Sequence, residues 1–331
     1  MRPSMTNIPY EKIKEELTGE RVMLVGGAGF IGRRMIPLLA AAGQEVTCMD
    51  IDVAGAQAAF ADLGDKVNVV RGDVTQFDDV IGAVQETRAE RLVNLSYFIG
   101  DLPPHVAFKL DIQGMDNCFE AARRCGVKHT VFASSVAVSG PQAHFGERLV
   151  DETDERRGDT QYAVNKITNE WQAHDYRRAY DMAITCIRPA NVTGPDKKFG
   201  SIDHVNCMCQ PARGQSITFP RADTMFCVIH VDDMAEVFAR VTLAEKPKYE
   251  TYNSGGTAVS LAELADQVRE FLPEADIRFK AESGGREISG NFLINNSRLI
   301  EEFGLQYAPL RQRVGEVIND IRAEAGQPPL S

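Results

Sequence analysis

The sequence lacks the features that direct a chain into or across a membrane. Its longest apolar runs, such as Leu38–Ala42, fall far short of the roughly 20 residues that a membrane-spanning helix needs. The first residues are polar and then charged, without an apolar segment or a small-residue cleavage site, so no secretory signal is predicted. Positive charge is also scarce, since the 331 residues carry a formal net charge of −11. We therefore expect neither a nucleic-acid partner nor a membrane partner.

Cysteine is sparse and shows no pairing pattern. The seven cysteines are scattered and odd in number, which is typical of reduced thiols and favours a cytoplasmic location. Cys207 and Cys209 form the only close pair, and their spacing fits no common zinc site, so no metal is predicted. Hydrophobic residues make up 44% of the chain, which is enough to build a sizeable core.

From residue 21 onward, short apolar runs alternate regularly with longer segments of helical composition. Short apolar runs are typical of buried parallel strands, and the intervening helices then cover both faces of the sheet. The predicted strands are Arg21–Gly26, Glu45–Asp50, Val67–Arg71, Arg91–Ser96, His129–Ser134 and Ala183–Arg188. With right-handed crossovers, this alternation predicts an α/β fold with a doubly wound parallel sheet, the Rossmann arrangement.

The alternation loosens after about residue 190, where glycine and proline interrupt shorter elements. Helical stretches are predicted over Val231–Ala244, Ser260–Leu272 and Leu310–Ala325. We interpret this half as a smaller α+β lobe that binds substrate and is partly interleaved with the first half. The predicted organisation is a polar extension over 1–20, a Rossmann domain over 21–190 and a substrate lobe over 191–331, with a soft boundary between the last two.

A glycine-rich turn follows the first predicted strand. It reads Gly26-Gly27-Ala28-Gly29-Phe30-Ile31-Gly32 and leads into a helical segment. Glycine at such a junction permits a tight turn and lets the backbone approach a pyrophosphate, while the helix N-terminus supplies amide donors. The spacing fits both Gly27-x-Gly29-x-x-Gly32, the general Rossmann pattern, and Gly26-x-x-Gly29-x-x-Gly32. Either interpretation predicts a bound dinucleotide, with Phe30 and Ile31 among the residues that contact it.

An acidic residue at the end of the second predicted strand indicates which dinucleotide is bound. Asp50 can accept hydrogen bonds from both ribose hydroxyls of the adenosine and would repel the additional phosphate of NADP. NAD is therefore the predicted cofactor. Asp73, which follows the third strand, is a predicted adenine contact, and Val74 and Leu95 complete the predicted cofactor-binding set on this side.

Three further residues are candidates for acid–base chemistry. Tyr162 and Lys166 stand four residues apart in a segment of helical composition, so their side chains share one helix face. A free tyrosine titrates near ~10, and a neighbouring ammonium favours the phenolate that a base requires. Ser135 follows the fifth predicted strand, whose carboxyl end faces the cofactor crevice, and it can donate a hydrogen bond to a carbonyl or alkoxide oxygen.

In combination, these motifs resemble the NAD-dependent epimerase/dehydratase family, the extended short-chain dehydrogenase/reductases. The resemblance covers roughly residues 20–325. It is carried by Gly26-x-x-Gly29-x-x-Gly32, Asp50, Ser134-Ser135, Tyr162-x-x-x-Lys166, Arg188-Pro-Ala-Asn191-Val-Thr-Gly194-Pro195 and His230-Val-Asp232-Asp233.

The resemblance implies a role for each residue of the set. Ser135 would orient the substrate oxygen, Tyr162 would exchange a proton with it, and Lys166 would hold the nicotinamide ribose and tune Tyr162. Residues expected beside the nicotinamide are Pro189 and Val192, with Asn191 reaching toward the substrate. The resemblance also implies a homodimer, formed through a four-helix bundle of Val106–Cys125 and the Tyr162 helix.

Departures from the family's patterns exclude some of the reactions that its members catalyse. Its dehydratases carry Asp-Glu beside the active-site hydroxyl and its decarboxylating members carry glutamate there, whereas this chain has Val136-Ala137. Nucleotide-sugar members usually place an arginine before the His230 motif to grip the diphosphate, and here that position holds Phe226. Arg286 is a candidate to grip an anionic substrate, and Asp111 stands where the family frequently has asparagine. The predicted substrate-contacting residues are Ser135, Asn191, Phe226 and Arg286.

The leading hypothesis is an NAD-dependent dehydrogenase or reductase that acts on a secondary alcohol or ketone of a small sugar-like or hydroxy substrate. The alternative is a sugar or nucleotide-sugar 4-epimerase, which uses the same three residues to oxidise and then re-reduce one carbon. A third hypothesis is a non-catalytic NAD-binding sensor. It is disfavoured because relatives of that kind tend to lose the tyrosine or the lysine, and Tyr162 and Lys166 are both present.

Overall fold

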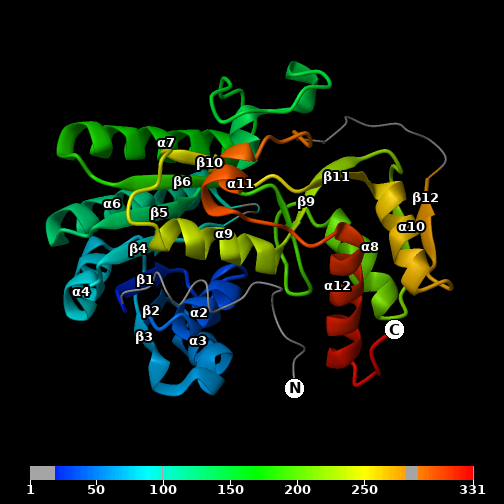
Figure 1. Cartoon of the computed structure of the whole chain (residues 1–331), viewed down its shortest axis with the longest axis horizontal. Helices are drawn as coiled ribbons and strands as arrows, with labels where there is room; N and C mark the ends of the chain where they lie inside the picture. Colours follow the sequence, from blue (N-terminus) through cyan, green and yellow to red (C-terminus); the bar gives the residue numbers. More distant parts are fainter. Residues whose placement is uncertain (1–18, 99, 101, 281–289, 331) are drawn as a thin grey trace.

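A seven-stranded parallel sheet forms the centre of the molecule (Figure 1). The computed structural model describes residues 19–98, 100, 102–280 and 290–330. The strand order is β10-β6-β5-β4-β1-β2-β3, and every neighbouring pair is parallel. The strands are β1 Arg21–Val25, β2 Glu45–Asp50, β3 Val67–Arg71, β4 Arg91–Asn94, β5 His129–Ala133, β6 Ile184–Arg188 and β10 Thr251–Asn253. The prediction of a doubly wound Rossmann sheet is confirmed.

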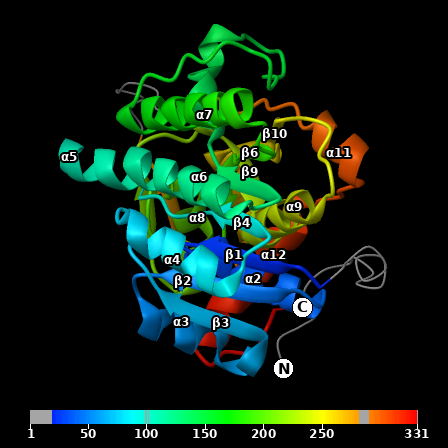
Figure 2. The same ribbon diagram turned by 90° about the vertical axis from the view of Figure 1, so that its left-hand side faces the viewer.

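Both faces of the sheet are covered by helices, which explains why its strands are almost wholly apolar. In β1, Val22 and Leu24 pack into one hydrophobic cluster and Met23 and Val25 into another on the opposite face. The first cluster lies under α2 Gly32–Ala41, α3 Val53–Phe60, α9 Val231–Leu243 and α11 Ser297–Phe303. The opposite face is covered by α4 Phe77–Thr87, α6 Gly114–Cys125 and α7 Gln161–Tyr180 (Figures 1 and 2). A strand buried on both faces needs apolar residues at every position, and this is the pattern that the sequence shows.

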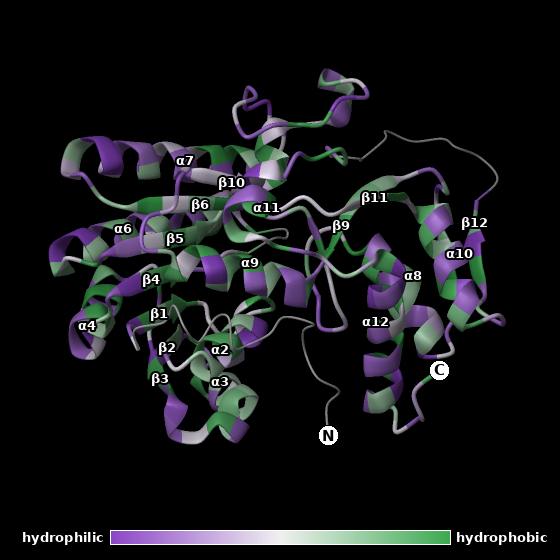
Figure 3. Ribbon diagram, in the orientation of Figure 1, coloured by the Kyte–Doolittle hydropathy of each residue, from purple (hydrophilic) through white to green (hydrophobic). Residues whose placement is uncertain are grey.

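A second hydrophobic core lies to one side of this sheet (Figure 1, right). Its helices are α8 Asp203–Ala212, α10 Leu261–Phe271 and α12 Leu310–Glu324. Its strands are β8 Ile217–Phe219, β9 Met225–His230, β11 Thr257–Ser260 and β12 Ile277–Phe279. The short strand β7 Asn191–Thr193 pairs with β9 but contributes Val192 to the core of the central sheet. The apolar residues of α12 recur at helical spacing and point into this core, while hydrophilic residues mark its outer side (Figure 3).

The chain returns to the central sheet after leaving it. Strand β10 pairs with β6 at the sheet edge, and α9 packs against α2 on the face below β1 and β4. Both elements follow residue 190 in the sequence. Segments from the second half of the chain thus contribute to the same layers as the first half.

The helical segment predicted over Val106–Cys125 consists of three pieces. It begins with the short helix α5 Pro104–Ala107, continues as a π-helical stretch over Phe108–Gln113 and ends as α6. Stretches of π-helix are rare inside α-helices and are frequent at functional sites. Within the ranges that the structure describes, no helix combines the length and the apolar composition needed to cross a membrane.

Candidate active site

The predicted cofactor and catalytic residues follow the carboxyl ends of successive parallel strands. In a parallel sheet these ends all meet at one edge, where the strand order reverses between β1 and β4. The residues concerned are Gly26 after β1, Asp50 at the end of β2, Asp73 after β3, Leu95 after β4, Ser135 after β5 and Pro189 after β6. Residues far apart in the sequence are thereby placed along a single edge of the sheet.

The turn after β1 has no room for a side chain at Gly26 or Gly32. Gly26 has φ +72°, and a Cβ added there would lie 2.8 Å from the Cα of Ser96. A Cβ on Gly32 would collide with the backbone carbonyl of Gly27. Helix α2 begins at Gly32 with no side chain capping its N-terminus, and the helix dipole there favours an anion. This cradle fits the pyrophosphate of a dinucleotide.

Asp50 is held next to the glycine turn by its own carboxylate. Its Oδ2 accepts a hydrogen bond from the Ala28 amide at 3.1 Å, and its Oδ1 accepts one from the Asp52 amide at 3.0 Å. Both nearby cations of α2 have partners. Arg33 Nε donates to the Ala28 carbonyl within the glycine turn at 2.6 Å, and Arg34 pairs with Asp196 and Asp232. The arrangement offers a carboxylate to the adenosine ribose and fits NAD better than NADP.

The adenine-side residues lie in tight turns. Asp73 Oδ1 accepts hydrogen bonds from the amide and hydroxyl of Thr75, at 2.9 and 2.8 Å. Val74 is buried, and its carbonyl accepts a hydrogen bond from Asn117 Nδ2 at 2.8 Å. The Leu95 amide donates to the carbonyl of Val25 at 2.9 Å, which keeps the segment after β4 beside the glycine turn.

Ser135 and Tyr162 meet at the carboxyl end of β5. Ser135 is buried, and its hydroxyl accepts a hydrogen bond from the Ala137 amide at 3.1 Å. Thr160 caps α7 through the Ala163 amide, which places Tyr162 in the first turn of that helix. Burial raises the pKa of Tyr162 to about 12, and a hydrogen bond with Ser135 acts in the opposite direction. The Tyr162 phenol is therefore a protonated acid in the free protein.

Lys166 lies one turn farther along α7 and is almost completely buried. Its Nζ donates a hydrogen bond to the Ala133 carbonyl at 2.6 Å, and only 2% of the residue is exposed. Burial lowers the pKa of Lys166 to about 7, because the charged form loses its hydration. The nearby carboxylate of Asp111 opposes that shift.

A second tyrosine, which no motif had singled out, completes this group. The Tyr97 ring centroid lies 3.3 Å from Lys166 Nζ and 5.3 Å from the Tyr162 ring, which it meets edge to face. Tyr97 stands just past Leu95 at the carboxyl edge of the sheet. Its place after a predicted strand was visible in the sequence, but nothing there indicated that its ring would reach Lys166.

The predicted substrate residues lie in or beside the second core. Asn191 Oδ1 accepts a hydrogen bond from the Cys227 amide at 2.9 Å, so its amide oxygen links β7 to β9. Phe226 is only 5% exposed and stacks on His204, with ring centroids 5.0 Å apart. Val192, which was predicted as a cofactor contact, is buried in the core of the central sheet. Arg286 lies outside the described residues.

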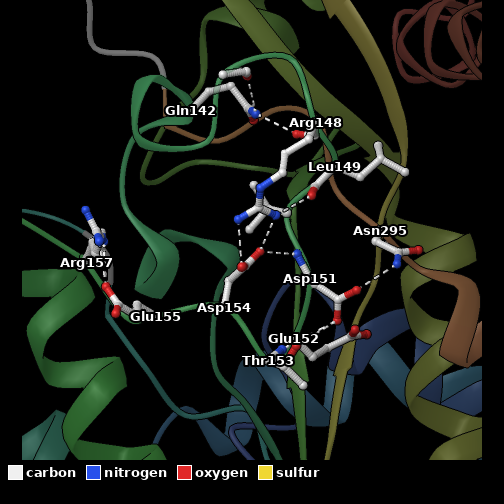
Figure 4. Close-up of polar contacts among 12 residues, drawn as sticks. Gln142, Arg148, Leu149, Asp151, Glu152, Thr153, Asp154, Glu155, Arg157 and Asn295 are labelled. Carbon is white, nitrogen blue, oxygen red and sulfur yellow. Dashed lines mark hydrogen bonds and ion pairs between the residues drawn. The ribbon is translucent and has the colours of Figure 1, made fainter.

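The loop that leads from Ser139 to α7 is fixed by ion pairs and hydrogen bonds (Figure 4). Arg148 donates two hydrogen bonds to the Asp154 carboxylate, at 2.8 and 2.7 Å. Asn295 Nδ2 donates to Asp151 Oδ2 at 3.0 Å, and Gln142 Oε1 accepts from the amides of 292 and 293. These contacts attach the loop to a segment near the end of the chain. No group of metal-ligating side chains occurs within residues 19–98, 100, 102–280 and 290–330.

Comparisons with known proteins agree with this geometry. A model of the "NAD dependent epimerase/dehydratase family" matches residues 22–255. The chain is 29% identical over 235 residues to UDP-glucose 4-epimerase of Mycolicibacterium smegmatis, covering 66% of this chain and 72% of that protein. It is 26% identical over 334 residues to dTDP-4-dehydro-6-deoxy-D-allose reductase of Streptomyces bikiniensis, covering 92% of this chain and 97% of that one.

Among solved structures, the chain resembles the UDP-glucose 4-epimerase of Thermus thermophilus in complex with NAD. The TM-score is 0.80 at 24% identity, and the match covers 91% of this chain and 99% of that one. At this identity the likeness concerns the fold.

Proposed function

The chain belongs to the NAD dependent epimerase/dehydratase family, and from this premise we propose that it transfers hydride between NAD and a secondary alcohol or ketone of a small sugar-like or hydroxy substrate. Membership of this family makes the protein an NAD-dependent enzyme, as the motifs predicted. The observation that carries the proposal is the grouping of Ser135, Tyr162 and Lys166 at the carboxyl end of β5.

Each of the three residues has a distinct task in the proposed reaction. Ser135 donates a hydrogen bond to the substrate oxygen, where negative charge develops. Tyr162 accepts the hydroxyl proton when an alcohol is oxidised and returns it when a ketone is reduced. Lys166 binds the nicotinamide ribose, and its ammonium favours the phenolate of Tyr162. NAD, when bound, supplies the carbon that accepts or donates the hydride.

The residues around the glycine turn support NAD as the cofactor of the proposed reaction. We assign Gly26, Gly29, Phe30, Ile31 and Gly32 to the phosphates. The remaining proposed cofactor contacts are Asp50, Asp73, Val74, Leu95, Tyr162, Lys166, Pro189 and Val192. The Asp50 carboxylate in contact with the turn supports this assignment, as does the pairing of Arg34 with Asp232.

A residue of the second core, Phe226, supports the proposal that the substrate is small. At the position where nucleotide-sugar members usually carry the diphosphate-gripping arginine, Phe226 is buried against His204. A buried aromatic ring offers no charge-assisted hydrogen bond to a diphosphate. A substrate without a nucleotide therefore suits this chain, with Ser135 and Asn191 as its proposed contacts.

A sugar or nucleotide-sugar 4-epimerase remains the second candidate. The relative from Mycolicibacterium smegmatis and the structure from Thermus thermophilus both carry the name UDP-glucose 4-epimerase, and epimerisation needs the same three residues. A relative covered over 97% of its length is instead named a reductase. Because Phe226 stands in place of the diphosphate-gripping arginine, net oxidation or reduction is the first choice.

Cofactor retention separates these candidates. An epimerase returns the hydride to its own intermediate, so its cofactor need not leave, whereas a dehydrogenase exchanges NAD in each turnover. We expect the purified protein, once denatured, to release much less than one NAD or NADH per chain. Near-complete occupancy, together with interconversion of UDP-sugar epimers, would favour the epimerase.

Two further features of the proposal concern assembly and location. Apolar side chains on the surface of α5, the π-helical stretch and α7 suit a homodimer formed through a four-helix bundle. They are Val106, Phe108, Val164 and Trp171. All seven cysteines are free thiols, which suits a reducing compartment such as the cytoplasm.

A further inference from the structure

A buried group of side chains surrounds the Lys166 ammonium beyond the three proposed catalytic residues. The face of the Tyr97 ring lies 3.3 Å from Nζ. The carboxyl group of Asp111, only 3% exposed, interacts with the Tyr97 hydroxyl. It also accepts a hydrogen bond from Asn165 Nδ2 at 3.0 Å. Three separate elements thus place polar groups around one ammonium.

The position of Asp111 is fixed by the packing of the π-helical stretch on α7. Asn169 Nδ2 donates to the Asp111 carbonyl at 2.8 Å, and Gln172 Nε2 donates to the Ile112 carbonyl at 3.1 Å. Together with Asn165, these amides lie along one face of α7, at the spacing of successive turns. Lys166 follows Asn165 directly in the sequence, so the helix that carries the ammonium also holds the Asp111 backbone and carboxylate.

The surroundings of Lys166 compensate for the water that it has lost. An ammonium inside a protein is costly unless neighbouring groups stabilise its charge. Here a carbonyl oxygen accepts its hydrogen bond, an aromatic face lies against it and Asp111 supplies negative charge. Glu170 also lies near Lys166, but its carboxylate is already paired with Arg188 and Arg156.

We infer that Asp111 and Tyr97 are positioning residues for Lys166: the carboxylate keeps the ammonium charged, and the ring holds it in place beside the Tyr162 phenol. The inference rests on the proposed function in one respect, namely that the Lys166 ammonium binds the ribose of NAD. It assigns a task to an acidic residue at a position where asparagine was expected, and to a tyrosine that no motif included.

The charge of Lys166 responds to every titratable group that faces it. Burial opposes the ammonium form of Lys166, while Asp111 and Glu170 favour it electrostatically. The nearby Cys186 on β6 stays an uncharged thiol, because burial raises its pKa. Burial raises the pKa of Asp111, whereas Asn165, Tyr97 and Lys166 act to lower it. Tyr162 lies on the same helix, with its ring centroid 5.9 Å from Nζ. If the Asp111 charge is removed, the pKa of Lys166 falls, and the ammonium is lost at a lower pH.

The test is the pH dependence of NAD affinity, measured by calorimetry on the full chain without any substrate. In the wild type, affinity should decrease as the pH rises through the pKa of Lys166. Asp111→Asn keeps the size and shape of the side chain and should move this decrease down by about one pH unit. Tyr97→Leu removes the ring and should weaken NAD binding about tenfold, while Tyr97→Phe keeps the ring and should weaken it much less.

A second carboxylate–phenol pair, Asp116 of α6 with Tyr176 of α7, provides the matched control. Asp116 lies on α6, is partly buried and interacts with the Tyr176 hydroxyl, but it does not contribute to the charge of Lys166. Asp116→Asn should therefore leave the pH dependence of NAD affinity unchanged. A thermal melt of each variant shows whether it is folded, and the Tyr97 variants carry the test if Asp111→Asn is not.

Lys166→Met separates this inference from the proposed function. If Lys166→Met binds NAD with the affinity and pH dependence of the wild type, the proposed role of Lys166 is wrong and the inference falls with it. If Lys166→Met loses the pH dependence while folded Asp111→Asn and Tyr97→Leu behave as the wild type does, the proposed function stands and the inference is overturned.

Discussion

The chemistry proposed for this protein depends on the phenol of Tyr162. In the free protein, burial raises the pKa of Tyr162 to about 12, and its hydrogen bond with Ser135 acts in the opposite direction. An uncharged phenol at neutral pH is suited to give a proton to a ketone oxygen. To accept a proton from an alcohol, it needs the positive charge of Lys166 close by.

Replacing Tyr162 by phenylalanine removes the only proposed proton carrier. We expect kcat to fall by about 10²–10⁴-fold, the usual contribution of a general acid–base group. NAD affinity, measured by calorimetry, should stay near that of the wild type because the ring and its packing remain. Tyr180→Phe, at an exposed tyrosine on the same helix, is the control and should retain full activity. Equal activity in Tyr162→Phe would exclude the proposed acid–base role.

At the scale of elements, one buried ion pair joins the strand and helix that carry the active site. Arg188 at the end of β6 donates hydrogen bonds of 2.8 Å to both carboxylate oxygens of Glu170 on α7. Ser134 at the end of β5 donates to the same carboxylate at 2.7 Å, and Arg156 donates at 2.6 Å. Breaking such a pair leaves a charge buried without its partner.

We therefore predict that Glu170→Gln destabilises the protein by roughly 3–5 kcal/mol, measured by denaturant unfolding at neutral pH. These contacts lower the pKa of Glu170 from 4.5 to about 2 in the folded protein. Its contribution to stability is therefore present above pH 4.5 and is lost as the pH falls toward about 2. The variant should lose this part of the acid dependence.

Glu120→Gln is the control for this prediction. The Glu120 carboxylate pairs with Arg123 and Arg124 on the helix surface, where solvent screens the interaction. Its replacement should cost at most about 1 kcal/mol. If the two variants lose the same free energy of unfolding, burial of the Glu170–Arg188 pair makes no additional contribution to stability.

Helix α2 depends on the missing side chain at its first residue. Gly32→Ala places a methyl group against the backbone carbonyl of Gly27, so we expect a loss of about 1–3 kcal/mol in stability and at least tenfold weaker NAD binding. Gly82→Ala, inside α4 with open space around it, should leave NAD binding unchanged and slightly stabilise the protein. Calorimetry and thermal melts check both variants. Normal NAD binding by Gly32→Ala would show that the glycine turn does not hold the cofactor.

The strands of the first half could be predicted closely from the sequence because a buried parallel strand is apolar throughout. Glu45–Asp50 and Val67–Arg71 have the predicted bounds, and the other predicted strands differ by at most two residues at an end. The strand β10 is too short to give a pattern of its own. The π-helical stretch also escaped prediction, because its hydrogen bonds to α7 depend on tertiary packing.

In the site, too, motifs within one segment could be predicted, whereas contacts between separate elements could not. A glycine turn, a carboxylate at a strand end and a tyrosine–lysine pair on one helix turn are local patterns, so the sequence displays them. The contact between Tyr97 and Lys166 joins residues of different elements, and no spacing rule connects them. Phe226 was predicted as a substrate contact from its aligned position, and its ring proves to be buried against His204.

At the scale of the whole molecule, the exposed apolar residues of α7 predict a dimer. Trp171 is 57% exposed and Val164 is 45% exposed, and the two lie two turns apart on the same face. A charge at such a position is incompatible with a packed interface. We predict that the wild type is a dimer in light scattering and that Trp171→Glu is a monomer. Ile300→Glu, at an exposed apolar residue on α11, should remain dimeric, and a monomeric wild type would refute the proposed bundle.

The most direct test of the proposed function is the formation of NADH from NAD in the presence of candidate alcohols. The panel contains small hydroxy acids and polyols on one side and UDP- and dTDP-sugars on the other, each assayed with the wild type and with Tyr162→Phe. We predict that the wild type forms NADH with at least one small substrate and that Tyr162→Phe loses this activity. Interconversion of nucleotide-sugar epimers by the wild type, without net NADH and without turnover of any small substrate, would contradict the proposal.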